Sequence, residues 1–158
     1  MKNVTAANTR RLVISSVLYM VVALMAAVVA IVQNRPAEAG LSSSLPVWQA
    51  FLYGPGTAMS PPLYWLVAQG ILTLLAPRRD RWGTAGVVGL TVVGLLFSVF
   101  GALEPIVLEI FSPKTFDLLK ASIVAGGIVL AFLMIVFGIL ELVRRRQCKR
   151  LGLVPADC

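Results

Sequence analysis

A long uncharged segment in the middle of the chain constrains the fold more than any other feature. No charged residue occurs in the stretch 84–103, which is about 20 residues long. As an α-helix it would measure about 30 Å, the thickness of the hydrocarbon core of a bilayer. Its small residues recur near whole helical turns and would share one face; they are Gly83, Gly94, Gly101 and, beside them, Ser98. Because helices in lipid associate through such faces, we expect this segment to be the central helix of a bundle.

The composition requires a bilayer as solvent for the rest of the chain as well. Of the 158 residues, 58% are hydrophobic and 13% are charged, whereas an average soluble domain has about 25% charged residues. A water-soluble globule of this size cannot bury so much apolar surface. The sequence therefore predicts an all-α membrane protein that forms one integral membrane domain over residues 1–158.

Four segments are predicted to be the transmembrane helices of an up-and-down bundle. They cover about residues 12–32, 60–77, 83–103 and 117–143. The first is longer than the apolar part of a secretory signal, so we expect a retained signal-anchor. The second is short and would need its first turn from residues 57–62. The fourth carries Gly126 and Gly127, which form a second predicted patch for close packing.

The connection between the first two spans contains a shorter helical signal. Ser44 can cap a helix that starts at Pro46. Gly54 and Pro55 would end this helix. It is too short to cross a membrane, so we expect it either in the external membrane interface or as an aromatic plug over the outer end of the bundle. By the same chemistry, Ser60 is predicted to cap the second span.

Positive charge is distributed very unequally between the two ends of the predicted bundle. Eleven of the 14 Lys and Arg residues lie in the segments 1–11, 78–81 and 144–158, where they would contact anionic lipid headgroups. The opposite connections hold only Arg35, Lys114 and Lys120. This asymmetry predicts a multi-pass protein of the cell (inner or plasma) membrane with both termini in the cytoplasm. The bias toward Ala, Gly, Val and Arg suggests a bacterial source.

The residue types argue against an enzyme. The chain has no histidine, which excludes histidine-based catalytic triads and most metal sites. The two cysteines, Cys148 and Cys158, lie in the tail, where a cytoplasmic location would keep them reduced. We expect no catalytic residue, no metal and no cofactor. The net charge of +7 belongs to membrane-flanking positions, so nucleic acid is not an expected partner.

Three polar residues are the best candidates for contact with a ligand. Gln69 is the only side-chain amide inside a predicted span, where an interhelical hydrogen bond is the expected role. Glu104 and Glu109 lie at the outer edge of the third span. They could bind a cation or carry protons, although polar punctuation at a helix end is the favoured interpretation.

The sequence favours a non-enzymatic accessory or interaction subunit, with a membrane-protein partner or a second copy of itself. The alternative is a small oligomeric transporter or channel for a small solute or ion. Its path would be lined by the polar side chains of the bundle, which are Gln69, Thr73, Thr91, Ser98, Glu104 and Glu109. A weaker alternative is a lipid-handling enzyme that uses the two outer carboxylates. The first two hypotheses differ in whether the polar side chains converge on one cavity or make separate helix contacts.

Overall fold

Five α-helices make up most of the described part of the chain, which is residues 2–36, 45–103 and 116–150 of a computed structural model. They are α1 (Lys2–Val32), α2 (Val47–Tyr53), α3 (Leu63–Leu75), α4 (Arg81–Leu103) and α6 (Leu118–Arg150). Three of them, α1, α4 and α6, contain segments that are long and apolar enough to cross a membrane. The predicted all-helical architecture is confirmed over the described residues.

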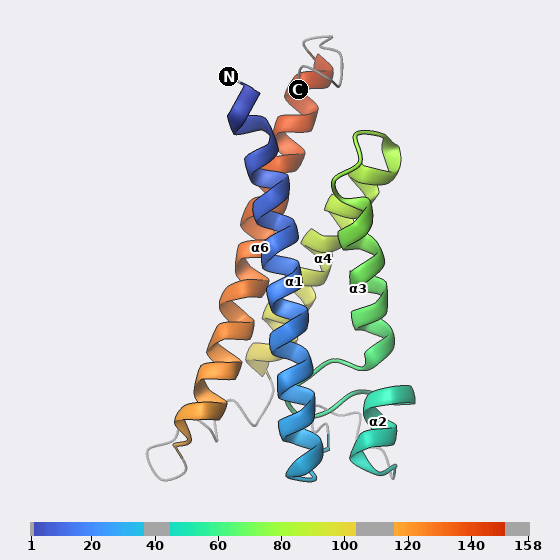
Figure 1. The fold of residues 1–158 in the computed structure, drawn as a ribbon, viewed down its shortest axis with the longest axis vertical. Helices are drawn as coiled ribbons and strands as arrows, with labels where there is room; N and C mark the ends of the chain where they lie inside the picture. Colours follow the sequence, from blue (N-terminus) through green and yellow to red (C-terminus); the bar gives the residue numbers. More distant parts are fainter. Residues whose placement is uncertain (1, 37–44, 104–115, 151–158) are drawn as a thin grey trace.

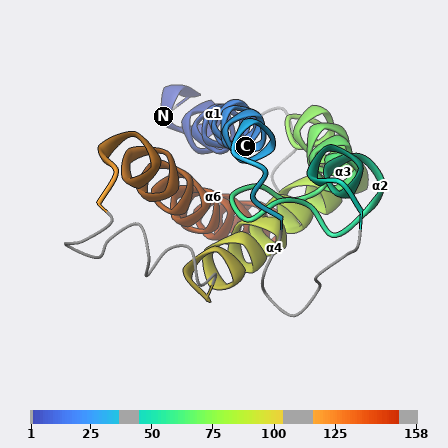
Figure 2. The same cartoon turned by 90° about the horizontal axis from the view of Figure 1, so that it is seen from below.

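The four longer helices run side by side and alternate in direction (Figure 1). Seen from below, their order around the bundle is α1, α6, α4, α3 (Figure 2). α6 packs extensively on both α1 and α4, α3 packs mainly on α4, and a narrower contact between α3 and α1 closes the bundle. The sequence predicts α4 as the central helix, whereas α4 shares that position with α6. The turn 78–81 and the C-terminal end of α6 lie at the same end of the bundle (Figure 1), and we call this the basic end.

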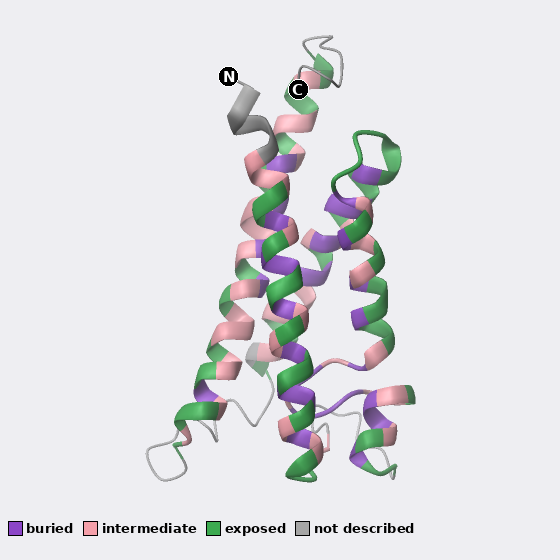
Figure 3. Cartoon of the chain, viewed as in Figure 1, coloured by how far each residue is buried: buried purple, intermediate pink, exposed green. Residues whose placement is uncertain are grey.

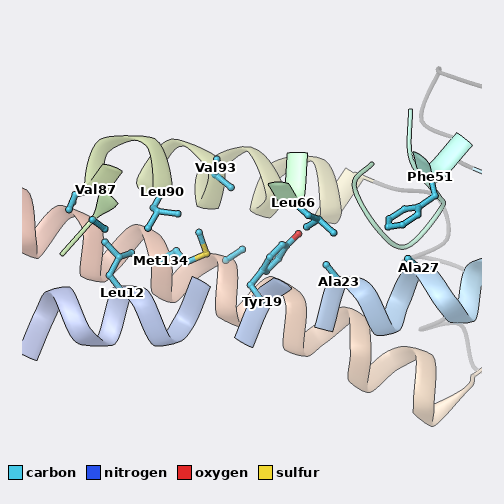
Figure 4. Packing of buried hydrophobic residues seen from close by; sticks show 12 residues of the cluster. Leu12, Tyr19, Ala23, Ala27, Phe51, Leu66, Val87, Leu90, Val93 and Met134 are labelled. Atoms are coloured by element: carbon cyan, nitrogen blue, oxygen red, sulfur yellow. The ribbon is translucent and has the colours of Figure 1, made fainter. Parts of the chain in front are cut away.

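Apolar side chains fill the inside of the bundle and also cover its outside. Leu12, Leu90 and Met134 are fully buried and meet between α1, α4 and α6 (Figure 4). The outward faces of the helices are exposed over most of their length (Figure 3). They carry large apolar residues such as Val28 and Leu74, which are 61% and 80% exposed. Apolar exposure of this extent is typical of a surface that contacts lipid.

α3 is shorter than the predicted second span. It has 13 residues, so it is about 20 Å long. The turn expected from residues 57–62 does not form, because Pro62 is extended and α3 begins after it. Pro61 precedes another proline, which disfavours the α conformation at Pro61. The predicted cap is also wrong, since the hydroxyl of Ser60 donates to the carbonyl oxygen of Pro61 at 3.1 Å and no side chain caps α3.

Residues 55–62, which we call the crossing segment, are largely buried below α3 without being helical (Figure 1). Every N–H from residue 56 to residue 60 has an acceptor, and the segment's three prolines have no N–H to satisfy. The acceptors are the backbone oxygens of Ala50, Ser60, Arg35 and Thr57 and the hydroxyl of Thr57. Gly56 has a φ of +104°, a conformation that glycine adopts readily. The local sequence therefore satisfies the N–H groups of a buried, irregular backbone.

α6 is longer than predicted at its C-terminal end. It begins after Asp117, whose Oδ1 accepts the N–H groups of Leu119 and Lys120 at 3.1 and 3.2 Å. It continues to Arg150, so the first half of the predicted tail is helical. Cys148 on this extension is disulfide-bonded, and the prediction of a reduced thiol is wrong for this residue. The other cysteine, Cys158, lies outside the described residues.

α2 lies in the first connection, and the predicted place of a short helix in the membrane interface stays a prediction. It follows Pro46 and ends before Gly54, whose N–H donates to the carbonyl oxygen of Ala50 at 3.0 Å. Phe51 on its inner face is buried in the main apolar cluster, while Trp48 on the other face is exposed. The predicted cap, Ser44, lies outside the described residues.

Candidate functional site

A cavity of about 310 Å³ lies at the end of the bundle opposite the basic end, which we call the open end. Its walls come from α1, α4, α6 and the first turn of α3, and the crossing segment closes one side. The lining is mostly apolar. Apart from the indole of Trp65, its polar side chains are the hydroxyls of Tyr19, Thr57 and Ser60. A pocket of this kind suits an apolar ligand more than a charged one.

Two structural features create this cavity. Toward the open end, α6 diverges from α1, as both views of the bundle show (Figures 1 and 2). In addition, the walls carry small residues. A Cβ atom on Gly101 would meet no described atom within 4 Å, and one on Gly127 would meet only Val22, at 3.9 Å. Both glycines line the cavity, so they leave space where the sequence predicts close helix contact.

Three aromatic rings stiffen one wall of the cavity. Tyr19 of α1 stacks on Phe97 of α4 with ring centroids 5.0 Å apart and an interplanar angle of 11°. Trp65 of α3 meets the same Phe97 ring edge-on, at 6.5 Å and 74°. Such pairs are each worth about 0.5–1.5 kcal/mol beyond the burial of their area. They connect three helices at the level where the cavity begins.

Gln69, the first predicted contact residue, lies away from this cavity and joins two helices. Its side chain is fully buried, and Nε2 donates to Ser16 Oγ at 2.9 Å and to the Ser16 carbonyl oxygen at 3.3 Å. The hydroxyl of Thr73 donates to the carbonyl oxygen of Gln69 at 2.8 Å. Since that proton is used, the Ser16 hydroxyl donates to Thr73 Oγ1, also at 2.8 Å. The result is a closed chain of hydrogen bonds between α1 and α3.

Sequence reasoning missed the role of Ser16. Its signal is positional, because Ser16, Tyr19 and Ala23 follow helical spacing and all face the interior.

Two buried polar atoms have no hydrogen-bond partner among the described residues, namely Gln69 Oε1 and Ser98 Oγ. Neither Gln69 nor Ser98 lines the cavity.

The predicted packing glycines that the structure describes do not converge on one site. A Cβ on Gly94 would lie 2.8 Å from the carbonyl oxygen of Ala131, and one on Gly83 would overlap the backbone of Arg78. A Cβ on Gly126 would meet no described atom within 4 Å. Glu104 and Glu109 lie outside the described residues. Close approach occurs also at three glycines that the predicted packing set omits, which are Gly86, Gly89 and Gly138.

A buried ion-pair network holds the basic end together. Glu141 is fully buried and accepts hydrogen bonds from Arg144 Nε at 2.9 Å and Arg145 Nε at 2.7 Å. Arg145 Nη2 also donates to the carbonyl oxygen of Ala76 at 2.8 Å. That oxygen lies at the C-terminus of α3, where carbonyl groups lack helical partners. The guanidinium therefore caps α3 and interacts favourably with the negative end of its dipole. The network locks α3 to α6.

These sites together show what the described chain can hold. Among its His, Cys, Asp and Glu residues there is no group of three or more that could hold a metal ion. The cavity offers shape and apolar surface, whereas the polar networks serve contacts between helices. Comparison of the chain with family models, with curated proteins and with solved structures finds no match.

Proposed function

We propose that this chain is a non-enzymatic integral membrane protein that crosses the bilayer four times and acts as an accessory or interaction subunit. The observation that carries the proposal is the placement of the polar side chains. Gln69, Ser16 and Thr73 join α1 to α3. Thr91 donates to the carbonyl oxygen of Val87 in its own helix. A transporter path needs such groups along one cavity, whereas these groups form hydrogen bonds within or between helices.

The fourth crossing in this proposal consists of α3 and the crossing segment together. α3 alone spans about 20 Å, which is less than the hydrocarbon core of about 30 Å. The crossing segment continues the path toward the open end, and each N–H from residue 56 to residue 60 has an acceptor. Irregular backbone is tolerated at membrane depth where protein or a cavity surrounds it. α2, with Trp48 and Tyr53 exposed, would lie in the interface at the same end.

Both termini face the cytoplasm in this arrangement, because the basic end carries most of the positive charge. The disulfide at Cys148 argues the other way, since disulfides persist in oxidising compartments. The two orientations are distinguished by labelling a Cys158→Ala variant, in which Cys148 is the single cysteine, with a membrane-impermeant maleimide. Labelling only in inverted vesicles is expected. Labelling in right-side-out vesicles would show that the C-terminal end faces the opposite side of the membrane.

The proposed function is tested by native mass spectrometry of the protein purified gently from its own membranes. We expect a second polypeptide in fixed stoichiometry, and its identity would name the process that the subunit serves. A parallel functional assay measures the flux of ions and small solutes across the membrane of vesicles that contain the purified chain alone. A homo-oligomer that carries such flux, with flux lost in Gln69→Leu, would overturn the proposal in favour of transport.

A further inference from the structure

We propose that the cavity at the open end binds one hydrocarbon chain of a bilayer lipid. This goes beyond the role of an accessory subunit and requires only that the bundle lies in a membrane. It rests on three properties of the cavity: its size and lining, its alignment with the bundle, and the backbone that closes it.

The size and lining of the cavity fit an alkyl chain. Its volume of about 310 Å³ is at the lower limit of small-ligand sites, which hold about 300–1,000 Å³. An apolar cavity of about 150 Å³ stays dry and admits benzene, so about twice that volume has room for part of one chain and not for a headgroup. Water would find few hydrogen-bond partners there, since the lining hydroxyls of Thr57 and Ser60 are bonded within the crossing segment and leave the Tyr19 hydroxyl as the main polar group.

The cavity extends along the axis of α1. Along α1 its lining runs from Tyr19 to Ala26, which is about 10 Å of helix axis. Tyr19 lies near the middle of the membrane-length segment Ala7–Val32. The crossing segment, with its hydroxyls, lies nearer the end of α1, where Ala58 N–H bonds to the carbonyl oxygen of Arg35. One end of the cavity is therefore deep, with the Tyr19 hydroxyl as its polar group, and the other approaches the interface.

The backbone that closes the cavity is the third argument. The crossing segment is the described stretch that leaves the helical conformation within the bundle, and it forms a wall of the cavity. The left-handed φ at Gly56 and the prolines at 55, 61 and 62 hold it in that shape. Gly101 and Gly127 face the same space from two other helices. Three separate elements, the crossing segment, α4 and α6, thus leave room at one place, and lipid is the apolar material that surrounds them.

The test uses the full-length protein in phosphatidylcholine vesicles that contain a small fraction of phosphatidylcholine with a diazirine in one acyl chain. After irradiation, the labelled positions are mapped by mass spectrometry. Peptides with residues 96–101 and 123–128 should carry several-fold more label than peptides from the outer faces around Val28 and Leu74, although those faces are highly exposed. Label spread in proportion to exposure would overturn the proposal.

Filling the cavity supplies the matched comparison. Gly127→Leu on α6 and Gly101→Leu on α4 place side chains in the cavity from two different helices. Gly126→Leu adds the same side chain to the adjacent residue, which also faces open space but does not line the cavity. The first two variants should lose the excess label several-fold, and the third should retain it. The proposal fails if a filling variant that elutes as the folded protein on size-exclusion chromatography keeps the excess label.

Discussion

The two ends of the bundle use the same residue type in opposite ways. Toward the basic end, a Cβ on Gly86 would lie 2.7 Å from the backbone nitrogen of Ala76, so α4 and α3 touch through their main chains. At the open end, a Cβ on Gly101 would meet no described atom within 4 Å. Glycine allows helices to approach in the first case and leaves a void in the second. A glycine in an apolar helix therefore marks either a contact or a space.

The polar groups follow the same division. At the basic end, the carboxylate of Glu141 and the guanidinium of Arg145 lock α3 to α6 with hydrogen bonds of 2.7–2.8 Å. At the open end, the hydroxyls of Thr57 and Ser60 serve only the crossing segment. The basic end is thus built for rigidity, and the open end retains volume for a ligand.

The largest expected effect comes from one substitution made at both ends. Gly86→Leu should destabilise the fold by about 3 kcal/mol, because backbone atoms of α3 must move to admit the side chain. Gly101→Leu should cost less than about 1 kcal/mol, since it enters open space. Both are measured by unfolding in mixed micelles, followed by circular dichroism. Equal losses at the two positions would break the comparison between the ends.

The ion-pair network should give the next largest effect. Glu141→Gln removes a buried charge that two arginines bond, and a loss of about 2 kcal/mol is expected from hydrogen bonds to charged groups. Arg146→Gln is the matched control, because it removes a charge from the same helical turn, whereas the ion pairs of Glu141 are with Arg144 and Arg145. Unfolding in mixed micelles measures both. If the two variants are equally stable, the network does not hold the basic end.

The Gln69 contact lies between the two ends and should have an intermediate strength. A double-mutant cycle with Gln69→Leu and Ser16→Ala isolates the bond between α1 and α3. The expected coupling is about 0.6 kcal/mol, the average for hydrogen bonds inside membrane bundles, with an upper limit of about 1.7 kcal/mol. Strictly additive losses would mean that the two side chains stabilise the bundle independently of each other.

The smallest effect concerns the carboxylates that start α4 and α6. The N–H of Gly83 and the charge of Arg78 hold the pKa of Asp80 below its ordinary value. The N–H and ammonium of Lys120 do the same for the pKa of Asp117. Because both pKa values are lowered in the folded state, their stabilisation is present above the ordinary value of about 4 and is lost as the pH falls through the lowered values.

This pH dependence is measured as thermal stability between neutral and acidic pH. Asp80→Asn and Asp117→Asn retain a capping side chain but cannot titrate, so each should flatten the acid loss slightly. Unchanged acid profiles in both variants would show that other carboxylates dominate the acid response.

Much of the helical architecture could be predicted from length and charge alone. Uncharged runs at 12–32 and 83–103 lie within α1 and α4 because a bilayer leaves an apolar segment of this length few alternatives to a helix, although α1 begins earlier, at Lys2. α3 was overestimated because Ser60 and Pro61 resemble a helix start, while the conformational effect of Pro62 on Pro61 moves the start to Leu63. That effect is visible in the sequence.

The cavity could not be predicted, because it depends on how α6 diverges from α1. Spacing places Gly101 and Gly94 on one face of α4, yet only Gly94 meets α6, with Ala131 within reach. Which glycine makes contact depends on the angle between helices, and the sequence does not encode that angle locally. The same limit applies to Ser16, whose partner Gln69 is distant in sequence.

The order of helices around the bundle has a consequence for synthesis of the protein. α1 packs mainly on α6, which is the last described helix to leave the ribosome. Until α6 inserts, α1 lacks its principal neighbour and the carbonyl oxygen of Ala76 lacks the guanidinium of Arg145. Chains interrupted before α6 should therefore be recognised by membrane proteases, and a pulse-chase comparison with the complete chain would show their faster turnover. Quality control of this protein would then depend on the final step of translation.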